Sequence, residues 1–250
     1  MAFRHPATKL ILFGWVGFIS ENLILSHNRK EIIESIGDDN YHRIYNSLST
    51  VACGSIAYGF LKYRNNGPLF SQYYPRLHSA MSSKLMRIPS IALRIIGLVG
   101  FSQLFPKLQT PVAYAVVQTD KVPSPKIVAR CPMDFNFDKN ADAISGWKRV
   151  TRHPALMSLG LFSFSFALTT PFVSSAIMFA MPLAFAFIGG AHQDYRFKRG
   201  DKGDYDEQFY KDTSLAPFQS LLCGSQKWGD LYKDMKGLNA TLAVLLALIF

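Results

Sequence analysis

Hydrophobic residues gather in five long stretches along the chain, each nearly free of charged side chains. The stretches cover residues 10–25, 44–63, 89–105, 155–169 and 172–190. A helix needs about 20 apolar residues to cross a hydrocarbon core about 30 Å thick, so each stretch has roughly the length of one membrane span. The pattern predicts an all-α fold, a polytopic transmembrane helix bundle with about five to six membrane helices.

The remaining segments complete the expected organisation of a single transmembrane domain over residues 1–236. Residues 106–152 are predicted to form a long extramembrane loop, and residues 237–250 a short apolar C-terminal helix. Because that last run is short for a full span, it predicts a half-membrane or interfacial helix, or a sixth span if it extends backward. No small-residue cleavage site follows the first apolar stretch, which we interpret as an uncleaved span.

Two of the predicted spans contain informative polar or small residues. Residues 44–63 are rich in Ser, Ala and Gly, which let helix backbones approach closely, so this span is expected at the centre of the bundle. Arg94 stands near the start of its span, within two turns of the basic segment 64–87. We therefore expect its guanidinium to reach outward to the lipid headgroups, and a position that faces a polar interior is the alternative.

Composition and charge narrow the class of partner. The chain is 49% hydrophobic and 18% charged, and 27 Lys and Arg against 17 Asp and Glu give a net charge of +10. No basic patch is interleaved with stacking aromatic residues in a soluble domain, so we expect no nucleic-acid partner. Basic loops instead indicate contact with anionic membrane lipids and a bound lipid. The three scattered cysteines argue against a disulfide framework.

Acidic residues and histidines fall on one membrane face when the loops are followed across the predicted spans. If the N-terminus lies on an A face, a B face receives residues 26–43, 106–153 and 191–236, with four of the six histidines and, counting Glu21 at that end of the first span, every Asp and Glu. His27 closes the first span and His153 opens the fourth, so both imidazoles are expected at one membrane depth. Imidazole is the usual axial ligand of a haem held between helices, and it is also a proton shuttle. Helix capping or headgroup binding would explain the same positions.

A cluster of cationic side chains stands just before the fourth span. Arg149, Arg152 and His153 precede Pro154, which suits the first turn of a helix. Cations at the positive end of a helix dipole are unfavourable by about a few tenths of a kcal/mol, so an anion is expected among them. Asp194, just after the fifth span, is one candidate partner. A bound phosphate, carboxylate or haem propionate is the alternative.

Three blocks of this sequence resemble the NnrU family. They are HNRKEIIESIGDDNYHRIYNSLST (27–50), KRVTRHPALMSLG (148–160), and the pair Asp194 and Arg196 at the end of the fifth span. The resemblance covers most of residues 10–230. It implies a helical membrane fold. In the 15-cis-zeta-carotene isomerase of this family it further implies a b-type haem, held by two histidines, that catalyses a redox-gated double-bond isomerisation.

Carried over by motif, the haem ligands of this chain would be His27 and His153. Members of the family commonly have another histidine about four turns into the helix after RHP, where this chain has Phe164, Ser165 and Phe166. An RHP before a membrane helix also occurs in isoprenylcysteine-type and phospholipid methyltransferases. Those enzymes usually have paired glutamates after their last spans, where Asp194-Tyr195-Arg196 stands here.

These features leave three functions from different classes, and the catalytic residues, if any, are not assigned. We favour a structural or accessory subunit of a larger complex, of respiratory type and in the mitochondrial inner membrane, with no cofactor beyond bound lipid. The alternative is a redox or isomerase enzyme with haem b, in which case a plastid membrane is the expected location. The second alternative is an isoprenylcysteine-type membrane methyltransferase that uses S-adenosylmethionine.

Overall fold

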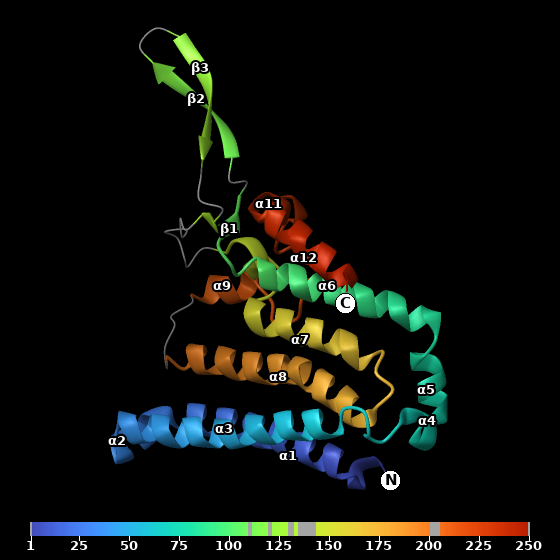
Figure 1. Ribbon diagram of the computed structural model, residues 1–250. Helices are drawn as coiled ribbons and strands as arrows, with labels where there is room; N and C mark the ends of the chain where they lie inside the picture. The colour runs from blue at the N-terminus through green and yellow to red at the C-terminus, as the bar shows by residue number, and fades with distance from the viewer. Residues whose placement is uncertain are drawn as a thin grey trace.

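The computed structural model is predominantly α-helical, and it describes residues 2–109, 112–119, 122–129, 133–134, 144–200 and 206–249 (Figure 1). The first half contains η1 (Ala2–Arg4), α1 (Pro6–His27), α2 (Arg29–Ile36), α3 (Asp38–Tyr63), α4 (Phe70–Tyr73), α5 (Pro75–Met81) and α6 (Lys84–Ser102). Four strands follow, β1 (Lys107–Leu108), β2 (Val112–Thr119), β3 (Val122–Ala129) and β4 (Met133–Asp134). The second half contains η2 (Gly146–Arg149), α7 (Pro154–Ala167), α8 (Val173–Lys198), α9 (Glu207–Asp212), α10 (Gln219–Leu222), α11 (Trp228–Asp234) and α12 (Gly237–Ile249).

Local sequence signals set the ends of the first helices. The His5 side chain accepts a hydrogen bond from the backbone N–H of Ala7, and Pro6 occupies the first turn of α1. Gly37 separates α2 from α3 with a φ of 85°, a backbone conformation that glycine adopts without steric cost. Asp38 and Asp39 then open α3, where negative charge is favourable next to the helix dipole.

The long helices are stacked in an order that differs from their order in the sequence. Figure 1 shows α12 beside α6, α6 beside α7, α7 beside α8, and α8 beside the pair α1 and α3. Glycines allow two of these crossings to be close. A Cβ on Gly14 would lie 2.6 Å from the carbonyl oxygen of Ala52, and one on Gly97 would lie 2.5 Å from the backbone nitrogen of Phe162. Close backbone approach of this kind is how helices pack in membranes.

Arg94 lies inside the bundle, which corrects the expectation that it reaches the headgroups. Its side chain is buried between α6 and α7, with Nε 3.5 Å from Ser165 Oγ and the guanidinium 4.5 Å from the centre of the Phe166 ring. The neighbouring Ser90 donates to the carbonyl of Ser165 at 2.8 Å. The position of Arg94 along its helix suggested that it lies near the headgroups. The face of α6 on which Arg94 lies is turned toward α7, so its side chain points into the bundle.

Three of the helices in the described part of the chain are long and apolar enough to cross a membrane, namely α1, α6 and α8. The shorter helices α7 and α12 are also apolar, with 14 and 13 residues. At 1.5 Å per residue they are about 21 and 20 Å long. The apolar helices indicate an integral membrane protein.

The segment 106–152 contains regular structure, whereas the sequence suggested a loop. Strands β2 and β3 pair antiparallel, from Val112 opposite Ala129 to Thr119 opposite Val122, and β1 pairs with β4. Strand β2, with the sequence VAYAVVQT, has the β-branched and aromatic residues that favour strands. Strand β3 contains two prolines, which are tolerated because both strands of a two-stranded ribbon are edge strands.

Helix α12 is held against the end of α6 by one buried asparagine. The side-chain amide of Asn239 donates to the carbonyls of Ser102 and Pro106 at 3.1 and 3.0 Å, and its oxygen accepts from the N–H of Leu108 at 2.8 Å. These bonds satisfy the backbone groups that are left unpaired where α6 ends. The apolar C-terminal run is therefore joined to the bundle at its first turn.

Candidate functional site

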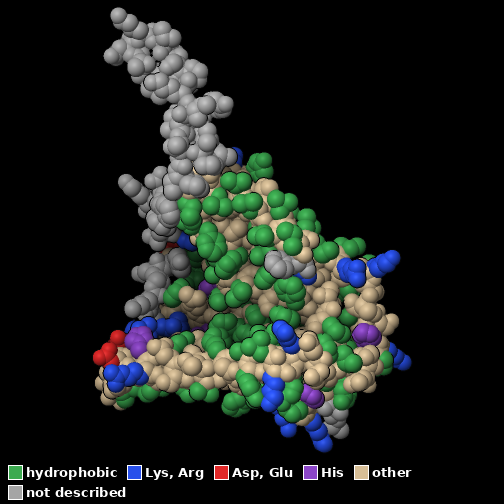
Figure 2. All heavy atoms as spheres, viewed as in Figure 1, with side chains coloured by type: hydrophobic (Ala, Val, Ile, Leu, Met, Phe, Trp, Pro, Cys, Tyr) green, Lys and Arg blue, Asp and Glu red, His purple; other side chains and the backbone are tan. Residues whose placement is uncertain are grey.

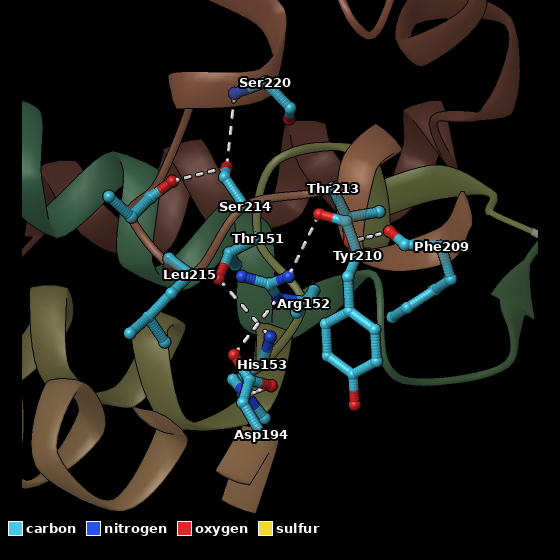
Figure 3. Close-up of polar contacts among 11 residues, drawn as sticks. Thr151, Arg152, His153, Asp194, Phe209, Tyr210, Thr213, Ser214, Leu215 and Ser220 are labelled. Atoms are coloured by element: carbon cyan, nitrogen blue, oxygen red, sulfur yellow. Dashed lines mark hydrogen bonds and ion pairs between the residues drawn. The ribbon is translucent and has the colours of Figure 1, made fainter. Parts of the chain in front are cut away.

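The cationic cluster before α7 meets an acid from the end of α8. His153 Nε2 lies 2.8 Å from Asp194 Oδ1, and Arg152 Nε lies 3.3 Å from Asp194 Oδ2 (Figure 3). Each carboxylate oxygen thus faces one partner, and all three side chains are largely buried. The pairing of Asp194 with Arg152 and His153 that the sequence suggested is present. It supplies the negative charge expected among cations at a helix N-terminus.

The polar tail folds back over this junction and is fixed to its backbone. The N–H of Arg152 donates to the carbonyl of Ser214 at 2.9 Å, and the Thr151 hydroxyl donates to the carbonyl of Leu215 at 2.9 Å. Residue Ser220 donates through its hydroxyl to the carbonyl of Arg149 at 2.7 Å. In Figure 3 these backbone segments lie above Arg152, His153 and Asp194. The junction between η2 and α7 is therefore enclosed by the segment after α9.

The mixture of charged and aromatic residues in the tail after α8 predicts a segment that packs back over the spans, with Tyr205, Phe209 and Phe218 as anchors. Two of these three side chains are packed in this way. The ring of Phe209 is buried. The ring of Phe218 packs edge-on against Trp147 at 6.2 Å and stacks on Trp228 at 6.1 Å between centroids. The third expected anchor, Tyr205, lies outside the described residues.

Arg149 has its own acidic partner, which sequence reasoning did not find. Its Nε lies 2.8 Å from Asp234 Oδ2, and its guanidinium donates to Gln226 Oε1 at 2.6 Å. The N–H of Gly146 also donates to Asp234, at 3.0 Å. Burial alone would raise the pKa of Asp234, but the hydrogen bonds from Arg149 and Gly146 and the charge of Arg149 hold that pKa below its usual value. Asp234 is therefore ionised at neutral pH and fastens α11 to η2.

His27 occupies a different place, at the end of α1. Arg199 approaches it twice, with a guanidinium nitrogen 3.3 Å from His27 Nε2 and another donating to the His27 carbonyl at 2.7 Å. The imidazole stacks on Tyr195 at 5.9 Å and lies 5.8 Å from the ring of His192, measured between centroids. His192 in turn lies 3.1 Å from the hydroxyl of Ser26.

Helix α8 separates the two histidines that the sequence offered as haem ligands. His27 contacts residues 192 and 195 of α8 and residue 199 at its C-cap, which are spaced three and four apart and share one helix face. His153 contacts residues 190 and 194, which lie on roughly the opposite face at 3.6 residues per turn. The structure brings each histidine to α8, but on different sides of it.

A single haem therefore does not fit between His27 and His153. Two axial imidazoles must face one iron from opposite sides, but here α8 lies between them and the Nε2 of His153 is already held by Asp194. Arg149 and Arg152, the expected partners of a bound anion, contact Asp234 and Asp194 instead. Among the described residues, no group of three or more His, Cys, Asp or Glu side chains is placed to hold a metal ion.

A family model described as NnrU protein matches residues 9–250, nearly the whole chain. The chain belongs to the NnrU family. No protein of curated function and no solved structure matches it.

In this NnrU protein the three resembling blocks converge at one end of the bundle. Residues 27–50 form α2 and the first half of α3, residues 148–160 form the start of α7, and Asp194 and Arg196 lie in the last turns of α8. A cavity of about 470 Å³ opens at that end, between α1, α3 and α8. Sequence reasoning had placed His42 and His192 on this face, and both line the cavity.

Most of the other polar residues that line the cavity were missed from the sequence. Ser26, Tyr41 and Tyr45 line it together with Arg29. Tyr45 donates to the side-chain oxygen of Asn22 at 2.7 Å, across the α1–α3 crossing. The only signal was the abundance of polar residues in 27–50, because the contacts themselves join residues far apart in sequence.

Proposed function

We propose that this NnrU protein is a structural subunit of a larger membrane complex. The observation that carries the proposal is that Arg149, Arg152 and His153, the residues that offered chemistry, all bind partners within the chain. Arg149 joins the polar tail to η2 through Asp234 and Gln226, and Arg152 and His153 join the start of α7 to α8 through Asp194. Side chains that are enclosed by contacts within the chain stabilise its fold, and a stable fold is what a structural subunit requires.

The proposal places five helices across the membrane, α1, α3, α6, α7 and α8, with α12 lying beside α6 as a half-span or a sixth span. Support comes from the apolar side chains that these helices expose, among them Phe13, Val51 and Leu85, which are 68, 64 and 72% exposed. Figure 2 shows apolar side chains covering much of the face over α6, α7 and α12. Lipid tails or apolar surfaces of other subunits would cover them.

A second apolar surface lies outside these helices and supports a protein partner. Leu222, Trp228 and Tyr232, on α10 and α11, are 76, 53 and 83% exposed. Large aromatic residues are enriched at protein interfaces, and a cluster of exposed apolar side chains marks an interaction surface. We refer to these three residues as the α10–α11 surface.

The test is the size of the particle that contains the protein in its own membrane. Tagged full-length protein, solubilised in digitonin, should migrate on native gels far above the 28.0 kDa of the chain. Replacing Leu222 and Tyr232 together by serine should release it from the larger particle, while the stack of Phe218 on Trp228 stays in place. Tyr73→Ser, at an exposed tyrosine on α4, is the matched control and should not. Migration of the wild type as a single chain in its micelle would overturn the proposal.

The same preparation separates the two enzymatic alternatives. A b-type haem enzyme of the isomerase kind would have a Soret band and sharp bands after reduction by dithionite. An S-adenosylmethionine-dependent methyltransferase would bind that cofactor in a calorimetric titration. We expect neither signal from the purified protein.

The finer form of the proposal is a complex of respiratory type in the mitochondrial inner membrane, with a plastid membrane as the alternative. Its support is the combination of apolar helices with a net charge of +10, which suits a bilayer rich in anionic lipid. Fractionation of cells that express the tagged protein should recover it with markers of the mitochondrial inner membrane. Recovery with plastid markers would overturn this location.

A further inference from the structure

The cavity between α1, α3 and α8 has a size typical of a ligand site. Its volume is about 470 Å³, within the usual range of about 300–1,000 Å³ for pockets that bind small molecules. Its wall comes from helices that are distant in sequence, and Leu156 of α7 contributes to it as well. The residues that join the polar tail to the junction between η2 and α7 do not line this cavity. The cavity is therefore separate from that junction.

One end of the cavity is cationic. Arg29 and Arg196 line it together with the imidazoles of His42 and His192, and none of the described lining residues is Asp or Glu. Figure 2 shows basic, imidazole and acidic side chains together at this end of the bundle, near α2 and the start of α3, and the acidic ones lie outside the described lining of the cavity. An anion is therefore the charge that complements this end of the cavity.

Asp38 stands outside the cavity and competes for Arg29 and His42. Asp38 lies 4.0 Å from Arg29 and 3.6 Å from His42, with its own side chain 62% exposed. Ion pairs this long and this exposed contribute little, because water screens them. A phosphate that offers several acceptor oxygens to the same arginine can replace such a contact.

Farther from Arg196 along α8 the wall becomes more apolar. Phe185 lines the cavity there, and Leu23 and Leu156 add apolar surface from α1 and α7, next to one amide side chain, Asn22. Phe185 and Arg196 are eleven residues apart on α8, which corresponds to about 16 Å along the helix axis. The cavity thus runs along α8 from a cationic mouth to an apolar end, and its occupant must be an amphiphile with an anionic head.

The mouth lies at the depth of lipid headgroups if α1 and α8 span the membrane. The cavity is lined by the last turns of both helices, and Tyr41 and Tyr45 beside it belong to the residue type that marks membrane interfaces. Basic pockets between membrane helices at this depth bind phospholipid headgroups. We propose that the cavity binds one anionic phospholipid, with its phosphate at Arg29 and Arg196 and one acyl chain along Leu23 and Phe185.

The test compares lipids that differ only in headgroup charge. Purified full-length protein in a mild detergent is titrated with dioleoylphosphatidylglycerol or dioleoylphosphatidylcholine, and the bound copies are counted by native mass spectrometry. We expect one copy of phosphatidylglycerol to bind before any phosphatidylcholine. Arg29→Gln and Arg196→Gln should each weaken that first binding step about fivefold, since a cation near a lipid surface contributes about 1 kcal/mol.

Two further variants separate the cavity from the general surface charge. Arg43→Gln is the matched control, because Arg43 is exposed on α3, next to His42, but does not line the cavity. It should leave the first binding step unchanged. Leu23→Trp, which fills the apolar end without changing charge, should abolish binding of the first copy while the protein keeps its thermal unfolding transition.

Three results would overturn the proposal. Equal binding of the two lipids would remove the headgroup preference, and equal weakening by Arg43→Gln would make the effect one of the surface. Inorganic phosphate is the third arm: if phosphate alone displaces phosphatidylglycerol at millimolar concentration and is insensitive to Leu23→Trp, the cavity takes a free anion. None of these results depends on whether the protein belongs to a larger complex, so the subunit proposal is tested independently.

Discussion

Asp194 is the residue on which the junction between α7 and α8 depends, because it pairs with both Arg152 and His153. Asp194→Asn removes the charge and leaves two largely buried donors facing a neutral amide. We expect the free energy of unfolding to fall by about 1–3 kcal/mol. In a chain of this size each 1 kcal/mol corresponds to about 2–4 °C in Tm, which thermal unfolding in detergent measures.

Glu207→Gln is the control for that measurement. Glu207 pairs with Lys211 at 3.1 Å, but both side chains are mostly exposed, so the loss should stay below about 0.5 kcal/mol. An Asp194→Asn variant as stable as the Glu207→Gln variant would mean that the buried pair does not stabilise the junction.

Asp234 should make stability depend on pH in the acid range. Its pKa in the folded protein is held below the ordinary value of about 3.9 by Arg149 and the N–H of Gly146, despite its burial. A lowered folded pKa gives stability that is fully present above the unfolded pKa and is lost as pH falls through the folded one. The gap in Tm between wild type and Asp234→Asn should therefore be constant from about pH 5 to 8 and narrow below about pH 4. A gap that stays constant down to pH 3 would contradict this assignment.

At the scale of elements, α12 depends on the bonds made by Asn239 to the end of α6 and to Leu108. Asn239→Leu leaves three backbone groups without these partners, so the start of α12 should open while α1 and α3 stay protected. Hydrogen exchange followed by mass spectrometry should report faster exchange in residues 237–249 and at the Leu108 amide, but not in the other helices. Thr241→Val, at an exposed hydroxyl that bonds only to Gly237 within the helix, should leave that exchange unchanged.

The positions of the helices could be predicted from the sequence, because a long apolar run has few other ways to satisfy its backbone in a membrane. A helix lies over each of the five expected stretches. The hairpin of β2 and β3 was not predicted, since the prolines in its second strand read as loop signals. The burial of Arg94 was missed because depth along a helix says nothing about rotation around it.

The same limit explains which parts of the site were predictable. Asp194 was found as a partner for Arg152 and His153 because it follows the span next to theirs and lies on the same face. Asp234, 85 residues away from Arg149, was not found, since nothing in the sequence joins the two. His27 and His153 were predicted to be a pair of haem ligands because both lie at the same expected membrane depth. In the structure they contact different sides of α8.

For the whole molecule, the five-span proposal fixes which segments share a side of the membrane. The connection between α1 and α3 and the tail that carries α10 must lie on one face, and the segment between α5 and α6 on the other.

Three positions suit a test, because Glu34, Ser82 and Cys223 are all exposed in these segments. In a background of Cys53→Ser and Cys131→Ser, a membrane-impermeant maleimide should label Cys223 from one side of sealed vesicles. Glu34→Cys, made with Cys223→Ser, should be labelled from the same side. Ser82→Cys, made with Cys223→Ser, should react only after the vesicles are opened by detergent or when they are inverted. Labelling of all three from one side would mean that α3, the one proposed span between Glu34 and Ser82, does not cross the membrane. It would also mean that an even number of α6, α7 and α8 crosses, and the α7 helix of about 21 Å would be the first of these three to reassign as re-entrant.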